Sequence, residues 1–266
     1  QHGGAAAQHD AVGFGVQRWQ AQVLRDCCIY ESFAYEMIAI ARDCIIDETD
    51  FTLLIAGNVY AFDSTTIDLC LNVFWWANFR KAKGAIKIHT LYDVKTSIPA
   101  FVHITEGNVH DVNVLDVLTY EADGFYIMDK AYVDFKRLFI INQSKAFYVT
   151  RAKENFNFKR ISSLKSDKTN GVICDQTVKL KGIKSSNCYP VVLRRIKYFD
   201  KEPRRTFVFL TNNFSQSAVD IAMLYKYRWK VELFFKWIKQ HLKIKSFWGT
   251  SMNAVKTQVY IAIITY

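Results

Sequence analysis

The chain carries apolar residues in two spacings, one typical of helices and one typical of strands. Over residues 29–42, apolar side chains recur every three or four positions, which predicts a helix. Residues 59–63 are apolar up to their final aspartate and predict a short strand, which the hydroxyl residues 64–66 are expected to end. Two more strands are predicted over residues 85–92 and 100–105, joined as a hairpin.

Further along the chain, strand and helix patterns alternate. Residues 113–120 predict a short helix, 125–128 a strand buried on both faces, 131–141 a helix and 146–149 another strand. Strands that alternate with helices commonly pair in parallel. This part of the chain therefore predicts an α/β sheet.

Residues 152–205 interrupt this alternation. Charged residues are denser there, and short apolar pieces are separated by turn-like stretches, which predicts a β-rich insertion. After it, residues 206–210 predict a last strand and residues 217–242 one long helix. The core face of that helix is expected to consist of Leu224, Val231, Phe235, Ile238 and Leu242.

These patterns divide the chain into four parts. Residues 1–28 show no clear periodicity and are expected to form an atypical or disordered segment. Residues 29–151 are the first part of the α/β core, 152–205 the insertion, and 206–266 the last strand and the long helix. Half of the 266 residues are hydrophobic, so the chain can bury a large core.

Positive charge dominates the composition. The chain has 35 Lys and Arg residues against 25 Asp and Glu, a formal net charge of +10. Such an excess favours a polyanion as partner, either nucleic acid or an anionic membrane surface. A basic protein without such a partner has the same composition, so the charge alone leaves both readings open.

Two classes of protein are not favoured. The six cysteines include no Cys-x-x-Cys pair, which argues against a zinc site or a disulfide scaffold and is typical of reduced thiols in the cytoplasm. Residues 1–27 lack a secretory signal, and no apolar run reaches the ~20 residues of a membrane-spanning helix. We therefore expect a cytoplasmic protein without a membrane partner.

Four residues on the predicted long helix give the first indication of chemistry. Tyr225, Arg228, Glu232 and Lys239 fall within a stripe roughly 60° wide on a helix of 3.6 residues per turn. The stripe borders the core face, so its carboxylate can be held rigidly and still reach solvent. One aromatic ring, two cations and one carboxylate suit a surface that binds phosphates beside a metal ion.

The same helix offers further candidates for DNA contacts. Trp229 lies on the side next to the stripe and could stack on bases, and Lys236 belongs to a group of lysines that suits backbone phosphates. Glu232 also has a simpler reading, as a surface residue that pairs with Arg228 or Lys236 one turn away.

Two aspartates extend the candidate site beyond this helix. Asp63 ends the predicted strand 59–63, and Asp129 follows the buried strand 125–128. Three carboxylates on rigid elements are enough to hold a pair of divalent ions for phosphoryl transfer, because Mg²⁺ prefers oxygen ligands. In isolation, Asp63 could equally cap a strand-to-turn junction, and Asp129 could be the N-cap of the following helix.

The residues of this candidate site carry a family resemblance. Tyr225, Arg228, Glu232 and Lys239 match, with all three gaps, the Tyr-(2)-Arg-(3)-Glu-(6)-Lys signature of the DDE transposases of bacterial insertion sequences, in the insertion-sequence-four family. The blocks Tyr-Ala-Phe-Asp-Ser-Thr-Thr-Ile-Asp around Asp63 and Met-Asp-Lys-Ala-Tyr-Val-Asp-Phe after position 127 resemble the two aspartate blocks of that family. The resemblance extends from about Ile29 to the last residue.

The resemblance implies a fold and an activity. The fold is RNase H-like (retroviral integrase-like), with a β-rich insertion between the second Asp and the Glu. The activity is metal-dependent cut-and-paste transposition through strand nicking, hairpin formation and strand transfer. Asp63, Asp129 and Glu232 would then be the catalytic ligands of Mg²⁺ or Mn²⁺, two ions in all, and Tyr225 and Lys239, with Arg228, would contact DNA.

The implied partners are double-stranded DNA, as terminal inverted repeats and as target, and a second copy of the chain in a homodimer. Family members usually begin with a helical domain that binds transposon ends, which residues 1–27 do not resemble, and the chain stops within an apolar stretch. The alternative is therefore a truncated, catalytically silent DNA-binding remnant. A third reading is another RNase H-like nuclease such as a junction resolvase, against which the signature spacing argues.

Overall fold

The computed structural model describes residues 26–45, 51–80, 83–165, 168–241 and 247–266. Within these ranges the strands are β1 (Val59–Leu69), β2 (Asn78–Arg80), β3 (Lys83–Asp93), β4 (Ile98–Glu106), β5 (Phe125–Met128), β6 (Phe147–Arg151), β7 (Phe158–Leu164), β8 (Val172–Leu180), β9 (Leu193–Asp200) and β10 (Arg205–Thr211). The α-helices are α2 (Cys27–Cys44), α3 (Phe135–Gln143), α4 (Ile183–Cys188), α5 (Ala218–Lys226), α6 (Trp229–His241) and α7 (Met252–Thr265), and the 3₁₀ turns are η1 (Asp111–Asp116), η2 (Lys130–Tyr132) and η3 (Lys168–Asn170).

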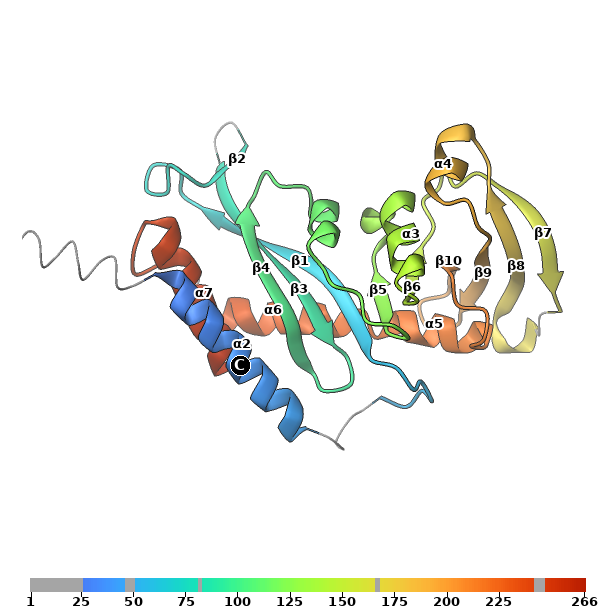
Figure 1. Ribbon diagram of the computed structural model, residues 1–266, viewed down its shortest axis with the longest axis horizontal. Coiled ribbons are helices and arrows are strands. Elements are labelled where there is room, and N and C mark those ends of the chain that lie inside the picture. Colours follow the sequence, from blue (N-terminus) through green and yellow to red (C-terminus); the bar gives the residue numbers. More distant parts are fainter. Residues whose placement is uncertain (1–25, 46–50, 81–82, 166–167, 242–246) are drawn as a thin grey trace, which may run out of the picture.

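The strands form one mixed sheet in the order β2-β3-β1-β5-β6-β10-β9-β8-β7, with β4 paired to β3. Its centre is parallel, because β1 pairs with β5 and β5 with β6 in parallel. The other pairs are antiparallel. The predicted α/β core is thus present, and the predicted insertion contributes β7, β8 and β9 to the same sheet (Figure 1).

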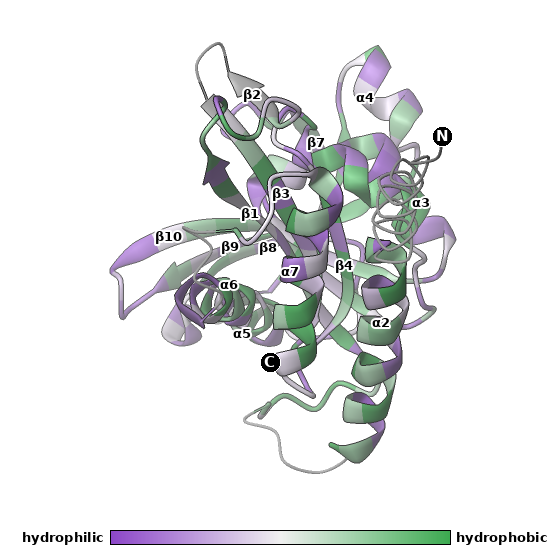
Figure 2. Cartoon of the chain, turned by 90° about the vertical axis from the view of Figure 1, so that its left-hand side faces the viewer, coloured by the Kyte–Doolittle hydropathy of each residue, from purple (hydrophilic) through white to green (hydrophobic). Residues whose placement is uncertain are grey.

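Helices cover both faces of the sheet. Along β1, Val59 and Ala61 pack into one buried cluster with residues of α2, α5, α6 and α7. Tyr60 and Phe62 point to the opposite face, into a cluster with η1 and α3. Continuous burial of both faces explains why this stretch lacks hydrophobic alternation. On the first face, α2 and α7 lie side by side although they come from opposite ends of the chain (Figure 1, Figure 2).

Strand β1 does not end where the hydroxyl residues begin, so this prediction was wrong. It continues to Leu69, because residues 64–66 pair with His89, Ile88 and Lys87 of β3. Threonine has a branched side chain that fits a pleated, half-buried surface, so these residues extend a strand that already has a partner. Asp63 therefore lies in the middle of a strand, at the point where its two-sided burial ends.

The predicted long helix over residues 217–242 is interrupted at Tyr227 and Arg228, which corrects a second prediction. The N–H of Arg228 donates to the carbonyl of Tyr225 at 3.1 Å, and that of Val231 to the carbonyl of Arg228 at 3.3 Å. These bonds span three residues, as in the tighter 3₁₀ winding. The core face continues across the break, so apolar spacing could not indicate it.

Of the core face predicted for this helix, Leu224, Val231, Phe235 and Ile238 are buried, and Leu242 lies outside the described residues. The segment predicted as one helix over residues 131–141 is also divided, into η2 and α3. Asp134 starts α3, since its carboxylate accepts from the N–H of Arg137 at 3.1 Å. The helix predicted over residues 113–120 is instead the 3₁₀ turn η1, which already ends at Asp116.

Within the described ranges, no helix has both the length and the apolar character needed to cross a membrane. The predicted N-terminal segment falls almost entirely outside these ranges, so the four-part division of the chain stays a prediction.

Candidate active site

The pairing of β1 with β5 brings the two candidate aspartates to neighbouring positions. Phe62 pairs with Met128 in this parallel ladder, and the next residue along each strand is the aspartate, Asp63 in one and Asp129 in the other. Glu232 lies in the first turn of α6, which packs against β1. Three elements far apart in sequence therefore supply carboxylates to one region.

Arg228 joins two of these carboxylates. Its Nη1 lies 2.9 Å from Oδ2 of Asp63, and its Nη2 lies 2.6 Å from Oε1 of Glu232. The residue lies in the break between α5 and α6, so the interruption of the predicted long helix coincides with this bridge. Glu232 does pair with Arg228, as its simpler reading as a surface residue expected. Arg228 also binds Asp63, however, so this pair belongs to the candidate site.

The third carboxylate is held by another arginine. Nε and Nη2 of Arg151, at the end of β6, lie 3.0 and 2.5 Å from Oδ1 of Asp129. The hydroxyl of Tyr225 donates to the same oxygen at 3.3 Å. Asp129 occupies the N-cap position of η2, as one of its two readings expected, but its carboxylate makes no capping hydrogen bond there and binds Arg151 instead.

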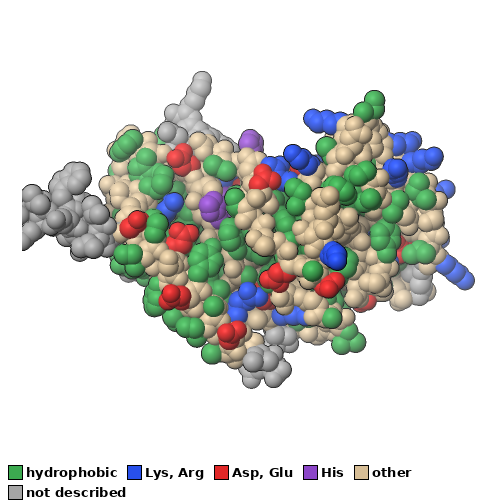
Figure 3. Space-filling view, viewed as in Figure 1, with side chains coloured by type: hydrophobic (Ala, Val, Ile, Leu, Met, Phe, Trp, Pro, Cys, Tyr) green, Lys and Arg blue, Asp and Glu red, His purple; other side chains and the backbone are tan. Residues whose placement is uncertain are grey.

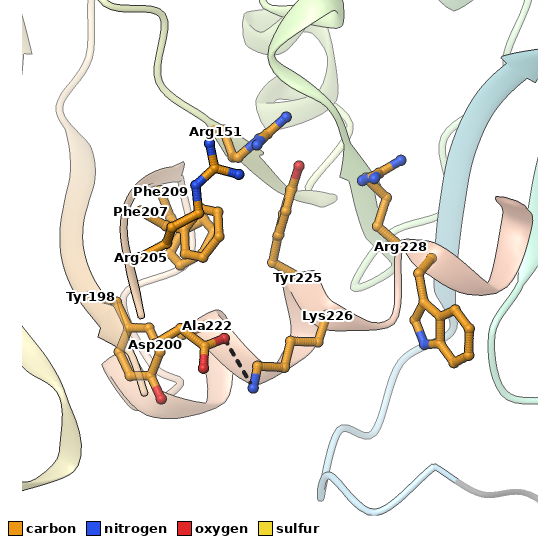
Figure 4. A pocket seen from close by; sticks show the side chains of 11 residues that line it. Arg151, Tyr198, Asp200, Arg205, Phe207, Phe209, Ala222, Tyr225, Lys226 and Arg228 are labelled. Atoms are coloured by element: carbon orange, nitrogen blue, oxygen red, sulfur yellow. Dashed lines mark ion pairs between the residues drawn. The ribbon is translucent and has the colours of Figure 1, made fainter. Parts of the chain in front are cut away.

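The ring of Tyr225 lies between the two arginines (Figure 4). The guanidinium carbon of Arg151 is 5.8 Å from the ring centroid, and that of Arg228 is 5.9 Å from it. Both distances fall within the range of cation–π attraction. Burial raises the pKa of Tyr225 to about 12, so its hydroxyl keeps its proton and remains a donor near neutral pH.

The carboxylates differ in their electrostatic surroundings. Burial raises the pKa of Asp63, and the charges of Glu232 and Asp129 act in the same direction, against the N–H of Ser64 and the guanidinium of Arg228. Burial also opposes ionisation of Asp129, but hydrogen bonds from Arg151 hold the pKa of that carboxyl below its ordinary value. The three acidic groups therefore lie close enough to repel one another, and the arginines compensate this repulsion.

The donor set fits a hard divalent cation, because it consists of carboxylate oxygens held by two guanidiniums that lie against the same tyrosine ring. Asp63 and Glu232 bind one guanidinium, which indicates that both face a common centre. The three carboxylates are not all within 4.8 Å of one another. Arg228 bridges two of them, Asp63 and Glu232.

A separate group of ligand-type atoms within 4.8 Å consists of Asp26, Cys27 and Cys28. These are consecutive residues at the start of α2, and the carboxylate of Asp26 accepts from the N–H of Cys28 at 3.2 Å as a helix cap. Their ligand atoms lie close together because the three residues are neighbours in sequence.

The other predicted DNA contacts lie along the same helix. Lys236 and Lys239 are exposed on α6, and within the described part of the chain neither forms an ion pair. Trp229 is 54% exposed and lines a cavity next to the candidate site. The structure thus brings Tyr225 and Arg228 to the carboxylates, whereas both lysines and Trp229 lie beside them.

Two neighbouring cavities extend from the site toward the insertion. The first, of about 270 Å³, is lined by Arg151, Arg205, Arg228 and Trp229 among others (Figure 4). The second, of about 500 Å³, shares Arg151 and Arg205 and adds Lys130, Lys153, Glu154 and Arg195. Figure 3 shows Lys and Arg side chains gathered over the insertion end of the molecule.

Two residues at the site were not predicted from the sequence. Met128 pairs with Thr150, so Arg151, the last residue of β6, lies beside Asp129, which follows β5. This parallel register was the available signal. The ring of Tyr132 packs edge-on against that of Phe62 at 5.1 Å between centroids, and its hydroxyl is buried. Burial and the negative charge of Asp63 raise the pKa of Tyr132.

The family model of the transposase DDE domain matches residues 56–266. The chain belongs to the transposase DDE domain family. This membership makes the α/β sheet an RNase H-like fold. Transposases of this family act on DNA, and their DDE domains generally use divalent metal ions.

Three proteins named as transposases are similar in sequence to this chain. The chain is 39% identical to the candidate transposase y4zB of Sinorhizobium fredii, over 77% of this chain and 58% of that protein. It is 34% identical to a candidate transposase for insertion sequence element IS5377 of Geobacillus stearothermophilus, over 77% of this chain and 54% of that protein. A candidate transposase for element IS4SA of Synechocystis is 23% identical, over 78% of this chain and 58% of that protein. The chain thus spans somewhat more than half the length of these relatives. The element names IS5377 and IS4SA are consistent with the insertion-sequence-four family.

Proposed function

We propose that this chain is the catalytic part of a DNA transposase that excises and inserts a bacterial insertion sequence. The observation that carries the proposal is the convergence of Asp63, Asp129 and Glu232, from three separate elements, on two arginines. Clustered carboxylates on rigid elements are suited to phosphoryl transfer with divalent ions. The proposed substrate would place the protein with the chromosome, in the bacterial cytoplasm and at the nucleoid.

Asp63, Asp129 and Glu232 would hold Mg²⁺ or Mn²⁺, two ions in all. Bound there, the ions would supply charge stabilisation at the transferring phosphate and lower the pKa of an attacking water. The contribution of the chain itself is to fix the carboxylates, through the β1–β5 ladder and the packing of α6 on β1. Burial of Asp63 also limits access of bulk water to that carboxylate.

The proposed reaction has three phosphoryl-transfer stages: nicking at the transposon end, formation and opening of a hairpin, and joining to target DNA. Nicking and hairpin opening replace a P–O bond of DNA with one to water, and the other transfers replace it with a bond to a DNA 3′-OH. Each P–O bond broken is matched by one formed, so no nucleotide cofactor is required.

The DNA contacts are proposed for the residues around the carboxylates. Arg228 and Lys239 would bind backbone phosphates, Tyr225 would position Arg228, and Trp229 and Lys236 would contact the strand next to it. The terminal repeats of the element and its target DNA are the proposed partners, and two copies of the chain would hold two ends. Excess positive charge supports a DNA partner of this kind.

The proposal is tested with the full chain, Mn²⁺ or Mg²⁺, and a duplex that carries the inverted repeats flanking its reading frame. We expect metal-dependent nicking at the repeat end, resolved on a sequencing gel, and loss of nicking in Asp129→Asn. Salt-sensitive DNA binding without cleavage, unchanged in Asp129→Asn, would instead indicate the silent remnant. Equal cutting of unrelated branched DNA would indicate a junction nuclease.

A further inference from the structure

Two guanidiniums bind all three candidate metal ligands, and both line the first cavity beside the site. We propose that Arg151 and Arg228 form a phosphodiester-binding pair that exchanges these carboxylates for a DNA phosphate, so that DNA and divalent ions bind the site cooperatively. This inference rests on the proposed function and adds a role for Arg151.

The first step concerns charge. Three carboxylates face two guanidiniums, and an arginine stays protonated at any pH at which the protein is folded. The side chains of Arg228 and Asp63 are only 17% and 20% exposed, so water screens their ion pair weakly. The positive charges of the two arginines therefore hold them against the negatively charged carboxylates.

The second step concerns competition for oxygen atoms. A divalent ion needs carboxylate oxygens in direct contact, and Oδ2 of Asp63, Oδ1 of Asp129 and Oε1 of Glu232 already accept from arginine N–H groups. An ion that took these oxygens would lie next to two positive guanidiniums in a partly buried site. Like charges repel strongly there, so the ion and the arginines disfavour each other's presence.

The third step concerns what could relieve this repulsion. The planar fork of a guanidinium matches a phosphate as well as a carboxylate. The cavity next to Arg151 and Arg228 is also lined by Arg205, and within the described part of the chain the buried Nε of Arg228 has no hydrogen-bond partner. A phosphodiester in this cavity would give that donor an acceptor and draw both arginines from the carboxylates.

Tyr225 can accompany this exchange. Its ring faces both guanidiniums, and its hydroxyl binds Asp129 (Figure 4). Cation–π attraction acts over a range of positions above the ring, so the arginines can shift while they keep this contact. By linkage, a phosphate that favours metal binding is itself bound more tightly when metal is present.

The inference is tested by titrating the full chain with Mn²⁺, with free Mn²⁺ followed by electron paramagnetic resonance. The titration is run with and without a mixed-sequence duplex whose binding is monitored by fluorescence anisotropy. We expect the duplex to tighten Mn²⁺ binding about 10-fold in the wild type. Arg228→Gln and Arg151→Gln should each bind Mn²⁺ more tightly without DNA and should lose most of the enhancement by DNA.

Arg137→Gln is the matched control, because Arg137 pairs with Asp116 and Asp134 outside the site. It should retain the wild-type Mn²⁺ affinity and the full effect of DNA. Arg228→Lys provides a second test if Arg228→Gln does not fold, since lysine keeps the charge but cannot span two carboxylates. Its Mn²⁺ affinity without DNA should lie above that of the wild type.

Equal Mn²⁺ affinity in the wild type and in both folded glutamine variants, with the same effect of DNA, would overturn the exchange. Failure of the proposed function gives a different result. If Asp63→Asn and Glu232→Gln leave Mn²⁺ binding unchanged, the carboxylates do not hold the metal. If they weaken binding while the arginine variants have no effect, only the exchange is wrong.

Discussion

At the scale of single residues, burial decides whether a titratable side chain is charged near neutral pH. His89 on β3 is fully buried, and its Nε2 lies 2.9 Å from Oγ1 of Thr105. Asp111 is 4.0 Å from the other ring nitrogen and favours the charged form, but burial prevails and lowers the pKa of His89 to about 4. This histidine is therefore a neutral structural group near neutral pH, in contrast to the charged arginines of the site.

Stability is expected to fall as the pH is lowered because of this histidine. In the unfolded chain this histidine binds a proton with the ordinary pKa of about 6.5. In the folded chain its pKa is about 4, so the unfolded state binds more protons between these two pH values and is favoured as the pH falls. The free energy of unfolding should therefore drop by on the order of 2 kcal/mol between pH 7.5 and pH 5. Urea unfolding of the wild type and of His89→Gln measures this contribution.

The His89→Gln variant should show a smaller drop than the wild type. His241→Gln, at the exposed end of α6, serves as the control and should keep the wild-type dependence. Identical pH profiles for the wild type and His89→Gln would show that the buried imidazole does not set this slope.

At the scale of elements, one buried ion pair ties the insertion to the helix that carries part of the site. Arg194 on β9 and Asp175 on β8 form two hydrogen bonds, of 2.9 and 2.6 Å, and their side chains are 4% and 7% exposed. Arg194 also donates to the carbonyls of Asn213 and Gln216, just before α5. The start of α5 is thus anchored to the insertion strands.

Removal of one partner of this pair should be costly. Asp175→Asn leaves a buried guanidinium without its counter-ion, which typically costs about 3–5 kcal/mol of unfolding free energy. Asp116→Asn removes the half-exposed partner of Arg137 and should cost at most about 1 kcal/mol. Urea unfolding of both variants at pH 7 compares them, and equal losses would contradict the role given to burial.

The elements also show what the sequence could and could not predict. Strand β5 and the parallel centre of the sheet were predicted, because burial on both faces leaves an uninterrupted apolar run. The end of β1 was not predicted, because residues 64–66 are held in the strand by pairing with β3, and the local sequence does not reveal this pairing. The break before α6 was missed since the apolar face runs through it, and Arg151 was missed because its position depends on register between strands.

At the scale of the whole molecule, the two neighbouring cavities beside the site are lined by several Lys and Arg residues. Arg205 at the start of β10 lines both cavities, between the site and the cations of the insertion. A strand of DNA that leaves the carboxylates toward the insertion would pass this residue. Several of the chain's cationic residues thus lie where the proposed substrate would pass, and Figure 3 shows Lys and Arg side chains at the insertion end.

Arg205→Ala should weaken DNA binding and lower its salt dependence. Loss of one phosphate contact reduces the slope of log K against log salt by about 1. Lys136→Ala provides a control, because this exposed lysine lies on α3, on the opposite face of the sheet from α5 and α6. Fluorescence anisotropy at several salt concentrations measures both slopes, and equal slopes for the two variants would contradict this DNA path.

The continuity of the sheet has a mechanical consequence. Strands β6, β10, β9, β8 and β7 are linked edge to edge by hydrogen bonds, so the insertion and the catalytic strands share one backbone framework. A framework of this kind resists swinging about a hinge, because any rotation would break ladder bonds along β10. DNA that bound along the two cavities as proposed would therefore have to bend to fit the sheet, because the sheet would resist bending to fit the DNA.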